Sequence, residues 1–179
     1  MTESETPTRK QLLIVSGIAM TILWVVLLVI DKDLEATGGP GILALEFAGS
    51  RERVVELMAE WGAHGTHLAR LSLWIDFAFM AAYGAFFVLA TRATRDFGQE
   101  HGLPALAKAG IVAPYLALGA ALFDVLENTV WLLALGGHGG EPGPPFATAC
   151  ASIKFLCIAL VILYCTWGLI SRLRLRRQR

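Results

Sequence analysis

Cysteine is scarce in this sequence, and what there is lies in one place. The 179-residue chain has three cysteines, Cys150, Cys157 and Cys165, all in one apolar stretch near the C-terminus. Because their number is odd and no two have C-x-x-C spacing, they imply neither a disulfide framework nor a redox motif. We interpret them as small, polarizable packing residues of a helix.

The chain also lacks the short motifs of common enzyme classes. It has no G-x-S-x-G, H-E-x-x-H, Walker or dinucleotide-binding fingerprint. Glu60, His64 and His67 have a spacing that would suit zinc on a continuous helix. Gly62 and Gly65 are expected to interrupt that helix, which favours a structural or interfacial role for both histidines. We therefore predict no metal site, and the sequence leaves any cofactor unknown.

Apolar residues, in contrast, are abundant. Hydrophobic residues make up 55% of the chain and the mean hydropathy is +0.58, above the range of soluble domains. Four stretches reach the ~20 apolar residues that a membrane-spanning helix needs: residues 11–30, 71–91, 109–135 and 146–170. We predict an all-α integral membrane protein, in which residues 1–179 form a single domain folded as a four-transmembrane-helix bundle. Residues 11–30 are interpreted as an uncleaved anchor, because the apolar run is longer than that of a signal peptide.

The basic residues predict how the bundle lies in the membrane. Ten of the fifteen lysines and arginines flank one set of span ends: Arg9, Lys10, Arg92, Arg95, Lys108, Arg172, Arg174, Arg176, Arg177 and Arg179. By the positive-inside rule we expect a multi-pass protein of the cell membrane with both termini in the cytoplasm. Residues 31–70 and 136–145 are then exoplasmic loops. The arginine-rich C-terminus directly follows a span, which favours contact with anionic lipids, and we expect no nucleic-acid partner.

The first exoplasmic loop contains an amphipathic pattern. Its apolar residues recur at helical spacing among charged ones: Val54, Leu57, Met58 and Trp61. With Ser50 as the N-cap, this pattern predicts a short loop helix between spans one and two. Residues 42–47 add a second apolar patch, so we expect the loop to lie on the outer face of the bundle, either as a lid or at the lipid interface.

Polar side chains inside the predicted spans indicate a site. Five charged or amide side chains lie in the interiors of these spans: Asp76, Asp124, Glu127, Asn128 and Lys154. A charge at the bilayer centre costs roughly 2.5–3.5 kcal/mol, so these groups should contact each other, water or a ligand. Counting ~1.5 Å per residue from the exoplasmic ends places the four charged groups ~9–17 Å deep, in one layer. We predict that Lys154 contacts a carboxylate of span two or three.

Spacing within the spans predicts which groups act together. Asp124, Glu127, Asn128 and Trp131 share one helix face, and two carboxylates there supply too few ligands for a metal ion beside a lysine. Asp76 and Tyr83 share a face of span two, with Arg70 above them. Because three acids face one lysine, at least one acid should be protonated, hydrated, paired with Arg70 or holding a cation.

These residues suggest an acid–base site in the outer half of the bilayer that binds or converts an amphiphilic lipid or isoprenoid-like molecule. Glu127 is the expected acid, with Asp124 or Asp76 as the base or orienting group. The expected ligand-binding residues are Asn128, Lys154, Tyr83, Trp131 and Arg70. If there is turnover, isomerisation, cyclisation and hydrolysis would each fit.

Other functions remain open at this point. Intramembrane acids and lysines are also typical of proton or small-ion transport, and of accessory subunits that pair their charges with another membrane protein. A homo-oligomer is equally compatible with the sequence. A purely structural network is disfavoured, because interhelical hydrogen bonds average only ~0.6 kcal/mol, below the insertion cost of each charge.

Overall fold

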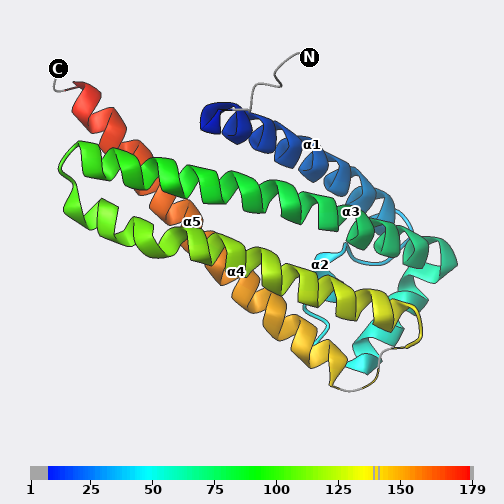
Figure 1. The fold of residues 1–179 in the computed structure, drawn as a ribbon. Helices are drawn as coiled ribbons and strands as arrows, with labels where there is room; N and C mark the ends of the chain where they lie inside the picture. The colour runs from blue at the N-terminus through cyan, green and yellow to red at the C-terminus, as the bar shows by residue number, and fades with distance from the viewer. Residues whose placement is uncertain (1–7, 139, 141, 178–179) are drawn as a thin grey trace, which may run out of the picture.

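The computed structural model describes residues 8–138, 140 and 142–177. Throughout these residues the only regular structure is helical (Figure 1), in five elements: α1 (Arg9–Glu35), α2 (Leu43–Glu46), α3 (Arg51–Glu100), α4 (Pro104–Leu135) and α5 (Gly143–Arg177). All but α2 are long and apolar enough to cross a membrane. The prediction of an all-α chain with four potential membrane-spanning helices is confirmed.

Each long helix extends beyond the span predicted for it. Hydropathy locates the apolar centre of a helix, whereas its ends depend on capping and on residues that break the helix. Thr8 caps α1, its side chain accepting a hydrogen bond from the backbone of Gln11. The C-terminal part of α3 continues past its apolar segment as far as Glu100. Gly102, with a φ of 65°, then turns the chain toward α4.

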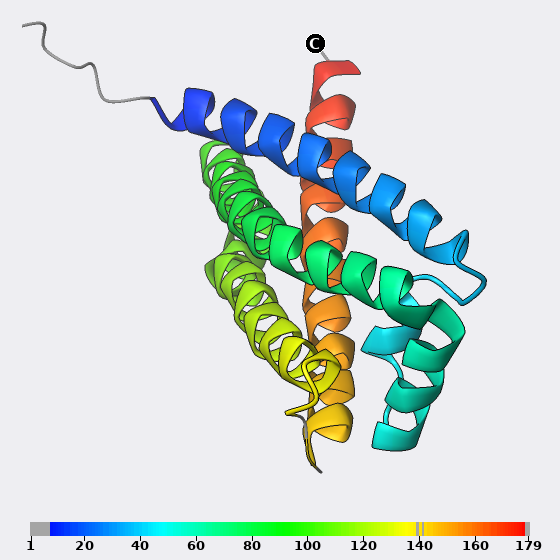
Figure 2. The same ribbon diagram turned by 90° about the vertical axis from the view of Figure 1, so that its right-hand side faces the viewer.

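The helices α3, α4 and α5 form the packed part of the bundle. α4 packs against both α3 and α5, while α1 packs along α3 alone among the helices described (Figures 1 and 2). Ala117 and Ala120 of α4 are buried, and a Cβ on Gly84 of α3 would lie 3.5 Å from the Cβ of Ala121. These small residues allow α3 and α4 to approach closely.

The predicted amphipathic loop helix is not confirmed as an element of its own. Ser50 caps a helix at Arg51, and Leu57 and Trp61 are buried, but this segment is the first part of α3. Gly62 bends α3 with a φ of 63° and a ψ of −170°, values that only glycine adopts readily. The expected interruption of the helix therefore occurs at Gly62, while the backbone is helical again at Gly65.

We expected the loop of residues 31–70 to lie on the outer face of the bundle, and its short helix α2 in fact buries one side between the long helices. α2 contacts α3, α4 and α5, and Leu45 is fully buried in a core that includes Leu34 and Leu57. Leu43 and Phe47, on the other side of this short helix, are exposed. Because the loop inserts one face into the bundle, it can bring a side chain into the interior.

Candidate functional site

Lys154 of α5 lies at the centre of a group of buried charges. Its side chain is almost fully buried, and its Nζ lies 2.9 Å from Asp124 Oδ1 and 2.8 Å from Glu127 Oε2, both on α4. A third carboxylate, Glu46 Oε2 of α2, lies 3.3 Å away. The predicted contact of Lys154 with a carboxylate of span three is present. We call Lys154, these three acids and Asp76 the charged cluster.

The two acids of α4 are three residues apart, so they lie on the same side of the helix and both reach Lys154. Asp124 accepts a hydrogen bond from the lysine, whereas Glu127 forms an ion pair whose angles fall outside those of a hydrogen bond. Glu127 Oε1 has no hydrogen-bond partner among the described residues, and neither has Asn128 Oδ1 or Trp131 Nε1. Leaving a buried polar atom without a partner costs about 1–3 kcal/mol.

Asp76 and Tyr83 of α3 complete the network. Asn128 Nδ2 donates a hydrogen bond to Asp76 Oδ2 at 2.8 Å and a longer one to the carbonyl of Leu73 at 3.3 Å. Tyr83 donates its hydroxyl proton to Asp124 Oδ2 at 2.9 Å. The structure therefore brings together six of the residues predicted from the sequence: Asp76, Tyr83, Asp124, Glu127, Asn128 and Lys154.

The structure does not bring the other two predicted binding residues into this network. Arg70 donates a hydrogen bond to the carbonyl of Leu135, the last residue of α4, and pairs with no acid of the cluster. A guanidinium is favoured there because the last carbonyls of a helix carry partial negative charge. Trp131 is fully buried in the apolar core beside Leu34 and Trp61.

A cavity of about 260 Å³ lies beside the cluster, between α1, α2, α3 and α5. Its polar lining residues are Asp31, Glu46, Ser72, Asp76, Tyr83, Asp124 and Lys154. Its apolar lining residues are Trp24, Leu27, Leu28, Ile42, Leu43, Leu73, Phe79, Phe155 and Ile158. Glu127, Asn128 and Trp131 do not line it, so Asp124 alone of the residues predicted to share this α4 face borders the cavity.

Sequence reasoning did not identify two acids of this cavity. Glu46 is the one acid within the apolar run of residues 41–48, a signal that could have pointed to a buried position. Burial raises the pKa of Glu46 above its ordinary value, and the nearby Lys154 opposes this shift. Asp31, at the end of the first apolar stretch, accepts a hydrogen bond from the Ile42 backbone at 2.6 Å and so holds the connection between α1 and α2.

The balance of charges determines what this site can do. Four carboxyl groups surround one ammonium group, so Lys154 cannot neutralise them all. Asp76 contacts Asn128 and Asp31 contacts the Ile42 backbone, so neither of these two cavity acids has a basic partner among the described residues. Such a site has spare hydrogen-bond acceptors, and it can hold a proton, a cation or a donor group of a ligand.

The four long apolar helices are compatible with a multi-spanning membrane protein, and the bundle holds a buried charged cluster beside a cavity. No model of a known protein family matches the chain, and the comparisons with curated proteins and with solved structures found no match.

Proposed function

We propose that the protein binds an amphiphilic lipid or isoprenoid-like molecule in this cavity. The observation that carries the proposal is the mixed lining of the cavity, which combines four members of the charged cluster with nine apolar side chains. An amphiphile would place its polar head against Asp76 and Asp124 and its apolar body against Trp24, Phe79 and their neighbours.

The mouth of the cavity is consistent with entry from the membrane. Trp24 of α1, Leu43 of α2 and Phe155 of α5 line the cavity and are also exposed at the surface of the bundle. At about 260 Å³ the cavity is smaller than the 300–1,000 Å³ of typical ligand pockets. It would therefore enclose the head of an amphiphile while the rest of its chain lies among the lipids.

The excess of carboxyl groups favours a head that donates hydrogen bonds, and an amine most of all. An ammonium group beside Asp76 would supply the positive charge that this acid lacks, whereas an anionic head would add to the excess of negative charge. If the site also converts its ligand, Asp76 is better placed than Glu127 to exchange a proton. Asp76 lines the cavity, while Glu127 is held behind Lys154.

The same proposal includes an orientation. The clusters of basic residues beside the start of α1 and the end of α5 favour cytoplasmic termini, with residues 31–70 and 136–145 on the exoplasmic side. The cavity would then open toward the outer leaflet. A route for ions to the opposite side has less support, because the hydroxyls of Thr91 and Tyr164 donate to backbone carbonyls.

The test compares three amphiphiles with the same chain and different heads: dodecylamine, dodecanol and dodecanoate. Binding to the protein in lipid nanodiscs is measured by calorimetry, with empty nanodiscs as the blank. We expect the amine to bind most tightly and the carboxylate most weakly. Asp76→Asn keeps the acceptor for Asn128, and it should weaken amine binding about tenfold or more, since a hydrogen bond to a charged group contributes roughly 1.5–3 kcal/mol.

The matched control is Asp33→Asn, which removes the charge of an exposed acid of α1 that does not line the cavity. It should bind all three amphiphiles as the wild type does. If the three heads bind equally, or if both variants behave alike, the cavity does not recognise a polar head and the proposal is wrong.

A further inference from the structure

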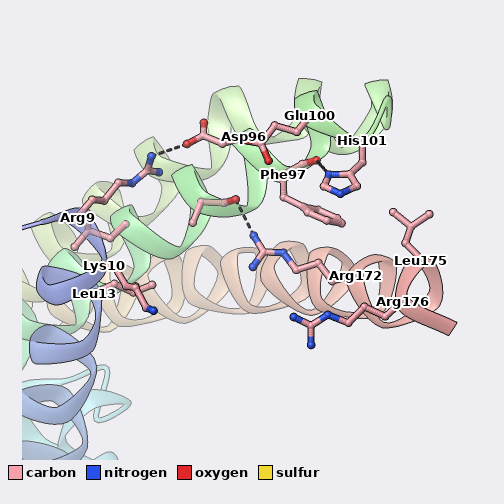
Figure 3. Close-up of a pocket in the computed structure, with 12 residues that line it drawn as sticks. Arg9, Lys10, Leu13, Asp96, Phe97, Glu100, His101, Arg172, Leu175 and Arg176 are labelled. Carbon is pink, nitrogen blue, oxygen red and sulfur yellow. Dashed lines mark hydrogen bonds and ion pairs between the residues drawn. The ribbon is translucent and has the colours of Figure 1, made fainter. Parts of the chain in front are cut away.

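A second and larger pocket lies at the opposite end of the bundle from the cavity. It has a volume of about 650 Å³ and lies between the start of α1, the end of α3 and the end of α5 (Figure 3). Four basic side chains line it: Arg9, Lys10, Arg172 and Arg176. Two acids, Asp96 and Glu100, line it as well, so positive charge is in excess. We call this space the basic pocket.

The contacts within the basic pocket leave part of its positive charge available. Arg9 pairs with Asp96 at 2.5 Å, as Figure 3 shows. Arg172 is held in place by a hydrogen bond of 2.9 Å to the carbonyl of Ala93 and by its position over a phenylalanine ring of α3. Within the described part of the chain neither Lys10 nor Arg176 forms an ion pair. These groups can therefore bind an anion.

An apolar groove continues from the basic pocket. The groove has a volume of about 420 Å³ and is lined by Leu13, Ile14, Gly17, Ile18, Thr21, Ile22 and Phe86. Leu13 lines both spaces, so they meet at this residue. From Leu13 to Ile22 the groove follows α1 for about 14 Å. The hydroxyl of Thr21 donates to the carbonyl of Gly17, so the one polar side chain of the groove is satisfied within its own helix.

We propose that the basic pocket and the apolar groove together bind one anionic phospholipid. Its phosphate would lie among Lys10, Arg172 and Arg176, because guanidinium and ammonium groups suit phosphate oxygens. One acyl chain would follow the groove between α1 and α3. The arrangement fits a phospholipid better than a free phosphate, since the basic pocket lies at the ends of potential membrane-spanning helices and its apolar extension runs along them. This site is independent of the cavity beside the charged cluster.

The experiment measures binding of short-chain phospholipids to the delipidated protein in detergent, by native mass spectrometry. The probes are dioctanoyl phosphatidylglycerol, dioctanoyl phosphatidylcholine and glycerol 3-phosphate. We expect the phosphatidylglycerol to bind in preference to the other two, because phosphatidylcholine has no net charge and glycerol 3-phosphate has no acyl chains.

Two double variants test the basic pocket. Lys10→Gln with Arg176→Gln removes two charges that line the basic pocket, and it should weaken phosphatidylglycerol binding roughly 30-fold. Arg174→Gln with Arg177→Gln removes two exposed charges of the same chain end that do not line the pocket, and binding should stay near that of the wild type. Arg172 is left in place because it also contacts α3.

For the groove, Thr21→Trp adds a bulky side chain inside it, while Val15→Trp adds the same side chain to an exposed position outside it. Thr21→Trp alone should weaken phosphatidylglycerol binding. The proposal is overturned if the two pairs of charge variants lose binding equally, if Thr21→Trp binds as Val15→Trp does, or if glycerol 3-phosphate competes as well as the intact lipid.

Discussion

Removal of the Lys154 amine should destabilise the fold far more than removal of any one carboxylate around it. In Lys154→Met, Asp124, Glu127 and Glu46 would remain buried together with no positive charge within the contact distances of 2.8–3.3 Å that the lysine now makes. Breaking a buried ion pair from one side costs about 3–5 kcal/mol. In Glu127→Gln the lysine keeps two carboxylate partners, so the cost should stay below about 1 kcal/mol.

The free energy of unfolding can be measured in bicelles by titration with dodecyl sulfate, with circular dichroism as the signal. The double variant Lys154→Met/Glu127→Gln has one buried carboxyl fewer than Lys154→Met, so it should be more stable than that single variant. The two substitutions should therefore be non-additive, with a coupling of about 1 kcal/mol or more. Equal costs for both single variants, or strict additivity, would refute the view that Lys154 balances an excess of acids.

Three other predictions concern different parts of the chain. Burial raises the pKa of Glu46 above its ordinary 4.5, so the folded carboxyl retains a proton that the unfolded one releases. The free energy of unfolding should therefore fall as pH rises from 4.5 toward the raised pKa. In denaturation curves, Glu46→Gln should make the free energy of unfolding less dependent on pH over this range. Gly110→Ala should destabilise the protein by about 1–3 kcal/mol, because the added methyl would collide with side chains of α3 and α5. Gly84→Ala is the control that should be tolerated, because its added Cβ would lie 3.5 Å from the Cβ of Ala121. Thermal unfolding measures the stability of both variants. In a background free of native cysteines, a cysteine at Glu56 should react with an impermeant thiol reagent in intact cells and one at Gln99 should not; the reverse result would invert the orientation.

Much of the charged cluster follows from local sequence periodicity. Asp124 and Glu127 share a face because they are three residues apart, and counting residues from the span ends places Lys154 at the same depth. Both rules hold for any continuous helix, and the helices α4 and α5 are continuous around these residues. The contact between α4 and α5 could therefore be anticipated without knowledge of the loops.

The remainder of the site depends on tertiary contacts that have no periodic signal. Glu46 reaches Lys154 because Leu45, its neighbour in α2, is buried between the long helices. Arg70 does not pair with the acids of the cluster, because its guanidinium donates a hydrogen bond to the carbonyl of Leu135 at the end of α4. Neither the path of a loop nor the position of a distant helix end can be read from the spacing of residues within one helix.

The position of α1 has a consequence for every measurement of binding. This helix contributes Trp24 and Asp31 to the cavity and Leu13 and Thr21 to the apolar groove, so it forms a wall of both spaces. Among the helices described it packs against α3 alone, and most of its length is exposed. In a bilayer, we expect lipid chains to cover that outward surface and to limit the movement of α1 away from α3. The surrounding medium should therefore affect both proposed binding sites, and we expect affinities to differ between micelles and bilayers even for an unchanged sequence.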